Sequence, residues 1–204
     1  MRATVSYAAF GVAAILITTA PPGGAQTAGP PGQPAAIGVP AVPVAPPVPP
    51  PVDPRTLFAG TFVPDAGPGN RGAIEAGINR AVAGFFFLVR GMAHDRISQG
   101  NPIFPFIRFA FPPGVIEMVA GSYVVRSADT GGESTTHGLD DHTNRLTQRF
   151  SAPDRLVQVT WNDDGRRQSD YVISADGRTL VLSVVITSGR LPQPVRYTMR
   201  YHRS

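Results

Sequence analysis

The chain has 204 residues, no Cys, no Lys, and a formal net charge of +4 from 18 Arg against 14 Asp and Glu. Without Cys it forms no disulfide and offers no thiolate for catalysis or metal binding. Without Lys it supports neither Schiff-base chemistry nor a P-loop. The Pro residues divide the chain, because 13 of the 22 lie in residues 1–54. So much Pro and Gly cannot build a core, whereas the remainder suits one domain.

Residues 1–25 have the pattern of a secretory signal peptide. Arg2 supplies the positive charge, residues 8–20 are apolar, and small residues just before Gln26 predict cleavage there. The apolar stretch is shorter than the ~20 residues that span a bilayer. We therefore expect an exported protein, periplasmic or secreted, with no transmembrane span in the mature chain. The alternative is that the segment is kept as an anchor.

Residues 26–54 form a Pro-rich linker between the signal peptide and the domain. Because Pro fixes φ and lacks a donor N–H, we expect extended polyproline II without a hydrogen-bonded ladder. Three roles are open for it: a spacer, a ligand for a proline-binding module, or a disordered leader without a partner.

From residue 55 to residue 204 the polarity mostly alternates with period two, which is typical of β-strands. The last strand is the clearest, since its apolar residues from Val195 to Tyr201 alternate with Arg, Thr and His. Asp164-Gly165 predicts a tight hairpin turn. The strands are expected near residues 57–63, 104–111, 115–119, 122–128, 144–150, 157–162, 171–173, 180–187 and 195–202.

These strands predict a mainly β domain over residues 55–204. Short turns favour pairing between sequential strands, hence an antiparallel up-and-down meander. A sheet of about nine strands buries one face by closing into a small lipocalin-like barrel or half-barrel. The alternative is an α+β curved sheet wrapped on the inserted helix.

One amphipathic helix is expected after the first strand, over residues 71–97, with Asn70 as its N-cap. Gly77, Gly84 and Gly91 recur every seven residues and share one face, where a strand or a partner helix can approach closely. Three Phe residues at 85–87 point in different directions. At least one faces away from the main contact, so the helix is either a plug inside the protein or a contact for another chain.

Several segments carry a family resemblance. They are Phe58-Ala-Gly-Thr-Phe62, residues 155–160, the turn Ser174-Ala-Asp-Gly-Arg-Thr-Leu180 and residues 191–197. Together they resemble a group of exported bacterial lipocalin-like proteins of unassigned function. Such proteins open with a Gly-Thr-Trp strand, and here Phe62 replaces the Trp. The resemblance covers about residues 55–203; it implies the barrel fold and supplies no catalytic residues.

One segment holds candidate metal ligands: His137, Asp140 and His142 lie within six residues. Because the segment is a predicted Gly-flanked loop, ordering three ligands there would cost considerable entropy. A solvated polar loop is the favoured interpretation. The sequence therefore predicts no metal and no cofactor.

Catalysis and nucleic-acid binding are also not expected. No Ser lies in a Gly-x-Ser-x-Gly elbow, so the sequence predicts no enzyme. The Arg residues are scattered, and Arg196 and Arg200 lie on the opposite strand face from Tyr197 and Tyr201. A stacking platform for nucleic acid needs both kinds of residue on one surface.

Two functions remain. The first is binding of a small apolar ligand, or of an envelope component, inside the barrel. The second is a structural or interaction module of the cell envelope whose barrel is filled by its own side chains. The oligomeric state is open for both. The residues expected to line a ligand site are Phe109, Phe111, Trp161, Tyr171, Tyr197 and Tyr201.

Overall fold

The computed structural model describes residues 53–138 and 142–204. The predicted signal peptide and the linker up to residue 52 lie outside this part. The described residues form three helices and ten strands. The helices are α1 (Pro54–Phe58), α2 (Gly69–Val82) and α3 (Phe87–Gln99). The strands are β1 (Gly60–Pro64), β2 (Ile107–Ala110), β3 (Val115–Ala120), β4 (Tyr123–Ala128), β5 (Ser134–His137), β6 (Thr143–Ala152), β7 (Arg155–Asn162), β8 (Gly165–Ile173), β9 (Thr179–Thr187) and β10 (Val195–Arg203).

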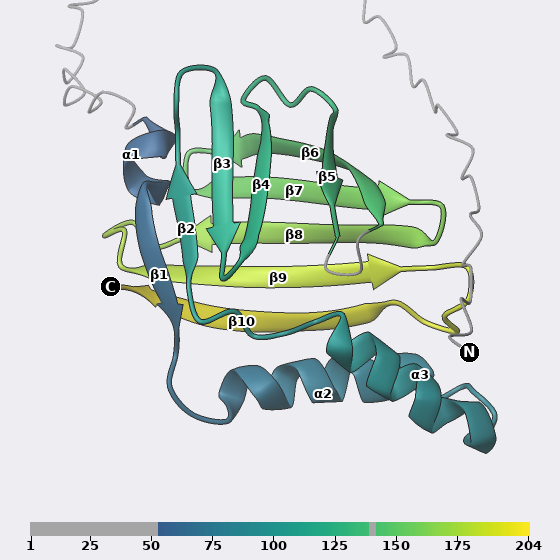
Figure 1. Cartoon of the computed structure of the whole chain (residues 1–204). Helices are drawn as coiled ribbons and strands as arrows, with labels where there is room; N and C mark the ends of the chain where they lie inside the picture. Colours follow the sequence, from purple (N-terminus) through teal and green to yellow (C-terminus); the bar gives the residue numbers. More distant parts are fainter. Residues whose placement is uncertain (1–52, 139–141) are drawn as a thin grey trace, which may run out of the picture. The chain divides into compact units, whose positions relative to one another are not determined.

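All ten strands of the described part belong to one antiparallel sheet in the order β4-β3-β2-β1-β10-β9-β8-β7-β6-β5. Each strand pairs with its sequence neighbour except β4 with β5, and β1 pairs with β10. Figure 1 shows β2, β3 and β4 crossing in front of β7, β8 and β9, so the sheet folds over on itself. The predicted meander closing into a lipocalin-like barrel, with a helical insertion after the first strand, is confirmed.

The barrel has a seam where its two edge strands, β4 and β5, meet. No backbone pairing joins these two strands, both of which are described. A side-chain hydrogen bond bridges the seam instead, because Ser127 Oγ on β4 donates to Gln148 Oε1 on β6 at 2.9 Å. Both residues are buried. The barrel is therefore nearly closed, and side chains complete it.

The predicted strands match β2 to β4, β6, β7, β9 and β10, whereas β8 extends well beyond the predicted residues 171–173. The predicted strand at residues 57–63 is instead α1 followed by β1, and Asp53 caps α1 by accepting from Arg55 N. β5 was not predicted, and its last residue, His137, was placed in the loop expected over residues 137–142. Its four residues, Ser-Thr-Thr-His, carry no apolar alternation that would mark a strand.

The single helix predicted over residues 71–97 is wrong, because the structure has two helices. α2 ends at Val82, and Phe86 has an extended backbone (φ −58°, ψ 142°) before α3 begins. The predicted N-cap is also wrong: Pro68 occupies that position. No helix of the described part is long and apolar enough to cross a membrane.

α2 covers the stretch of β10 that β1 leaves unpaired (Figure 1). β1 pairs with β10 between Tyr201 and Arg203. Next along β10, the Asn70 side chain takes the place of a neighbouring strand. Its Nδ2 donates to Arg200 O and its Oδ1 accepts from Arg200 N, both at 2.9 Å. Asn70 therefore fixes the register of α2 against the strand rather than capping the helix.

Candidate functional site

The aromatic residues predicted to line the interior separate into three groups. Phe109, Tyr171, Tyr197 and Tyr201 are buried in the core. Phe111 is half-buried and packs near Phe150, with ring centroids 5.7 Å apart. Trp161 lies elsewhere. The structure therefore brings four of the predicted residues into the core and places Phe111 at its margin.

Trp161 is on the outer face because the inward and outward faces of β7 are reversed relative to the prediction. Leu156 and Gln158 are buried, and side chains alternate along the unbroken pairing of β7 with β8. Thr160 therefore follows them inward, whereas Val157, Val159 and Trp161 face outward. From the sequence, Trp161 was expected to face the interior. The reversal shows that this side of the barrel has a polar lining.

A chain of hydrogen-bonded polar side chains forms that lining. Gln148 Nε2 donates to Gln158 Oε1 at 3.2 Å, and Gln148 also accepts from Ser127. Gln158 Nε2 lies 3.5 Å from Thr160 Oγ1. Each buried amide needs such partners, since an unpaired one costs about 1–3 kcal/mol. The polar chain crosses the inner wall from β4 to β7.

At the end of this chain lies Arg167, which the register places opposite Thr160. Arg167 shares the inner face of β8 with Ser169 and Tyr171 by alternation. Its Nη1 donates to Asn101 Oδ1 at 2.9 Å, its Nη2 to Tyr197 OH at 3.2 Å, and its Nε to Ser169 Oγ at 3.4 Å. All three acceptors are neutral. Among the described residues no carboxylate forms an ion pair with Arg167.

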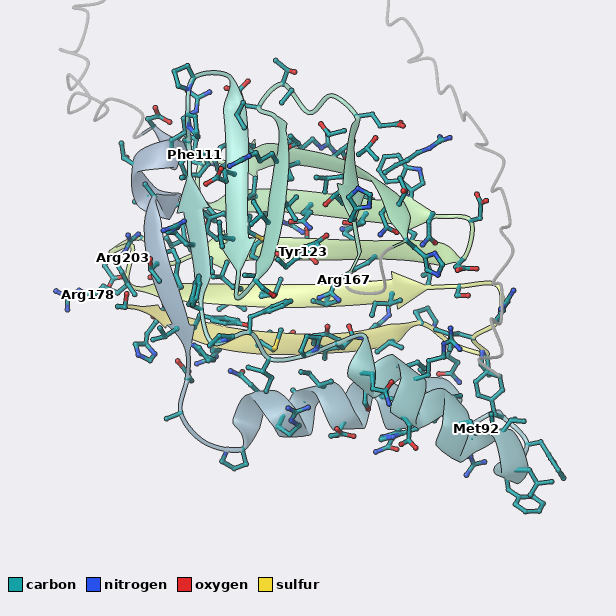
Figure 2. The ribbon with its side chains drawn as sticks, viewed as in Figure 1. Met92, Phe111, Tyr123, Arg167, Arg178 and Arg203 are labelled. Carbon is teal, nitrogen blue, oxygen red and sulfur yellow. The ribbon has the colours of Figure 1, made fainter. Side chains whose placement is uncertain are left out.

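Asn101 holds this arrangement against the helices. It follows α3 and is buried, and its Nδ2 donates to Ile97 O at 2.7 Å. Its Oδ1 accepts from Arg167 and also from Tyr197 OH, the latter at 2.7 Å. Figure 2 shows Arg167 level with β8 and β9, toward the end of the barrel where α3 lies. The guanidinium is thus positioned by fixed elements on three sides.

The Tyr residues around Arg167 are neutral at physiological pH. Burial raises the pKa of Tyr171 to about 12. Burial likewise raises the pKa of Tyr197 and of Tyr201, while the positive charge of Arg167 acts in the opposite direction. These phenols serve as hydrogen-bonding groups, and Arg167 supplies the positive charge.

Alkaline pH is therefore expected to destabilise the domain. The folded state keeps a proton on Tyr171 that the unfolded state releases above about pH 10. The stabilisation is complete below that pH and is lost as pH rises toward 12, by roughly 2–3 kcal/mol for this group. Urea unfolding at a series of pH values checks this. Tyr171→Phe should flatten the dependence, and an unchanged slope in that variant would contradict it.

The opposite half of the interior is apolar and rich in aromatic rings. Phe58 meets Phe109 edge to face with ring centroids 5.8 Å apart, and Phe109 meets Tyr171 in the same way at 5.2 Å. Phe62 lies 6.3 Å from Phe109. Such pairs contribute about 0.5–1.5 kcal/mol beyond their buried area. The interior is thus divided into an apolar half and a polar half that ends at Arg167.

The candidate metal ligands do not form a site in the described residues. His137 is exposed at the end of β5, His142 is exposed just before β6, and Asp140 lies outside the described part. Within residues 53–138 and 142–204, no three His, Asp or Glu side chains group closely enough to hold a metal ion.

The structure assembles a polar cluster between α2 and α3. His94 Nε2 lies 2.8 Å from Glu75 Oε2, and His94 Nδ1 lies 3.4 Å from Asp95 Oδ1. The two carboxylates flank one imidazole and connect α3 to α2. The separation of 19 residues hid the pair, because a single straight helix would place Glu75 and His94 far apart.

An open groove of about 540 Å³ lies between α2 and strands β9 and β10. Small side chains, among them Ala73, Ala76 and Ser183, line most of it, with Arg80 and Arg196 beside them. Because it opens to solvent and is lined by few large side chains, it offers little enclosure for a ligand.

Comparisons with known proteins yield structural similarity alone. No protein-family model matches the chain, and no curated protein matches it in sequence. A Schistosoma mansoni fatty acid binding protein in complex with arachidonic acid is 14% identical with TM-score 0.46, over 74% of this chain and 98% of that one. Echinococcus granulosus fatty-acid-binding protein 1 is 12% identical with TM-score 0.46, over 72% and 98%. A luciferase domain from the dinoflagellate Lingulodinium polyedrum is 9% identical with TM-score 0.45, over 71% of this chain and 41% of that one.

Proposed function

We propose that the barrel binds a small amphiphile with an apolar body and an anionic head, and that Arg167 holds the head. One observation carries this: Arg167 presents a positive charge at the inner wall, and its three hydrogen-bond acceptors are all neutral. Arg167 is half-buried, and a charge partly withdrawn from water loses hydration that an opposite charge can compensate. A carboxylate or phosphate head beside Arg167 would provide that compensation.

The division of the interior supports an amphiphile over a purely apolar ligand. The Phe-rich half suits a hydrocarbon body. The polar chain from Ser127 to Thr160 offers amide and hydroxyl groups to the ligand's polar atoms or to water. Guanidinium groups recognise carboxylate and phosphate through two parallel N–H bonds. Tyr197 OH and Asn101 lie close enough to Arg167 to contribute to the same contact.

The second candidate is a filled barrel that acts as a structural or interaction module. The edge-to-face contacts among Phe58, Phe62 and Phe109 favour it, since these rings already pack against one another. This alternative leaves the charge of Arg167 without a function.

Ligand binding by Arg167→Gln tests the proposal. Gln keeps hydrogen-bond donors but removes the charge. A fluorescent fatty-acid probe should bind the wild-type chain about ten- to a hundredfold more tightly than its uncharged methyl ester, since a charge-assisted hydrogen bond contributes ~1.5–3 kcal/mol. Arg167→Gln should abolish that preference, measured by fluorescence titration.

Arg166→Gln is the matched control, because Arg166 is exposed on the outer face of the same strand. Arg166→Gln should leave the preference unchanged. Any binding of the probe to the apolar residues 8–20 is common to the wild-type chain and both variants, so it does not affect the comparison. A wild-type chain that binds acid and ester equally, or neither, would contradict the proposal. The filled-barrel alternative expects no binding that depends on Arg167.

A further inference from the structure

The first half of α3 presents a compact apolar surface to solvent. Five of the seven large exposed hydrophobic residues in the described part lie between residues 86 and 92. Phe87 is 69% exposed and Met92 is 75% exposed, and the rings of Phe86 and Phe87 contact each other at a tilt, with centroids 4.7 Å apart. Figure 2 shows Met92 toward the far end of the helix pair, away from the barrel. This α3 cluster consists of Phe86, Phe87, Leu88, Val89 and Met92.

The α3 cluster is anchored to the rest of the domain although it is exposed. None of the residues of α3 is fully buried. Its inner side packs on the core through Ala93 and Ile97, and His94 contacts Glu75 on α2. Arg90 Nη2 donates to Ala83 O and Phe85 O, which fixes the turn between the helices. The apolar side chains are therefore presented outward by a defined scaffold.

Positive charge surrounds the α3 cluster. Residues 76–94 contain Arg80 and Arg90 and no acidic residue. The β9–β10 loop, with Arg190, lies against the interhelical turn, since a Cβ at Gly84 would lie 3.1 Å from Pro192 Cβ. Residues 177–204 contain no acidic residue either.

Four carboxylates lie near this end. Glu75 and Asp95 lie beside His94, and Asp163 and Asp164 lie in the neighbouring β7–β8 turn, before Gly165 and the exposed Arg166. The Arg residues of this end outnumber them, so the end of the barrel around the α3 cluster carries net positive charge; they are Arg80, Arg90, Arg96, Arg166 and Arg190.

We propose that the α3 cluster docks onto the surface of an anionic lipid bilayer. An exposed patch of Phe, Leu and Met flanked by Arg is the composition that inserts into the headgroup region, with the Arg residues held at the phosphates. Each basic residue near such a surface adds about 1 kcal/mol, roughly a fivefold gain in affinity. A second copy of the chain suits the surface less, because two positively charged ends would repel. The docking is peripheral and does not depend on a ligand in the barrel.

The absence of Cys from the chain allows a site-specific test. Met92→Cys in the full chain is labelled with an environment-sensitive fluorophore, and Val124→Cys on the outer face of β4 serves as the matched control. Vesicles of phosphatidylcholine with phosphatidylglycerol should shift the emission at residue 92 to the blue, and spin-labelled lipids should quench it. The label at residue 124 should not respond. Binding should weaken severalfold between low and high salt.

Paired substitutions measure the contribution of the apolar side chains. Phe87→Ser with Leu88→Ser should reduce vesicle partitioning by at least about tenfold, since each buried side chain of this size contributes more than a factor of ten. Val124→Ser with Val172→Ser should leave it unchanged. No response at residue 92, or an equal response at residue 124, would overturn the proposal. So would a response that grows with protein concentration without vesicles, since a second copy would then cover the cluster.

Discussion

Gly77→Ala is expected to lower the free energy of unfolding by about 1–3 kcal/mol, although Ala is the better helix former. A Cβ at this position would lie 2.4 Å from Arg196 O and 3.1 Å from Arg196 C, both backbone atoms of β10. The strand cannot move away cheaply, because Arg196 pairs with Val185 on β9. Arg80 also donates to the same Arg196 oxygen at 3.3 Å. Chemical denaturation of the two chains measures the difference in unfolding free energy.

Gly91→Ala is the matched control, since it makes the same chemical change within a helix. A Cβ at Gly91 would meet no atom within 4 Å. This variant should therefore gain stability, by up to about 1 kcal/mol from helix propensity alone. The same substitution is therefore expected to change the free energy of unfolding in opposite directions at Gly77 and Gly91. If both substitutions changed stability in the same direction, the close approach at Gly77 would be contradicted.

The seven-residue spacing of Gly77, Gly84 and Gly91 shows what sequence periodicity could predict about the helices and what it could not. It correctly predicted a close approach by a strand at Gly77. It could not reveal that Gly84 lies in a turn, because apolar residues continue at helical spacing through Val89 and Met92. Those residues are exposed, so the apparent amphipathic stripe does not face the core. A surface hydrophobic cluster and a buried helix face look the same in sequence.

The strands were easier to predict than their orientation. Alternation located most strands because an inward and an outward set differ in polarity. For β7 the assignment of the two sets failed: Gln158 is inside and Trp161 is outside. When the lining itself is polar, the local sequence cannot show which set of side chains faces inward. The orientation of β7 depends on the side chains that the neighbouring strands β6 and β8 place opposite it.

The candidate site was recognised in its apolar part and missed in its charged part. Arg167 appeared in the sequence as one of two Arg beside a hairpin turn. The sequence did contain a signal, because Arg167 and Ser169 are separated by even numbers of residues from Tyr171, which was expected to line the interior. Its neighbours Asn101 and Tyr197 are 66 and 30 residues away, and pattern analysis does not detect such contacts.

Arg203→Ala is expected to lower the free energy of unfolding by about 2–4 kcal/mol. The Arg203 guanidinium closes the end of the barrel opposite the helix turn (Figure 2). Its Nε donates to Gly177 O at 2.7 Å, and its other two nitrogens donate to Ala59 O and Leu57 O. It also lies over the Phe62 ring, 4.7 Å from the centroid. One side chain thus joins the β8–β9 turn, the α1–β1 connection and β10.

The loss should be large because three backbone carbonyls lose a charged donor together, and the cation–π contact with Phe62 is lost with them. Arg203→Lys should recover part of the stability, since one ammonium cannot reach all three acceptors. Arg178→Ala is the matched control: Arg178 is an exposed neighbour, and its removal should cost less than about 0.5 kcal/mol. Thermal and urea unfolding measure all three variants. Equal stability of Arg203→Ala and Arg178→Ala would show that the β-sheet alone, without this side chain, closes the end of the barrel.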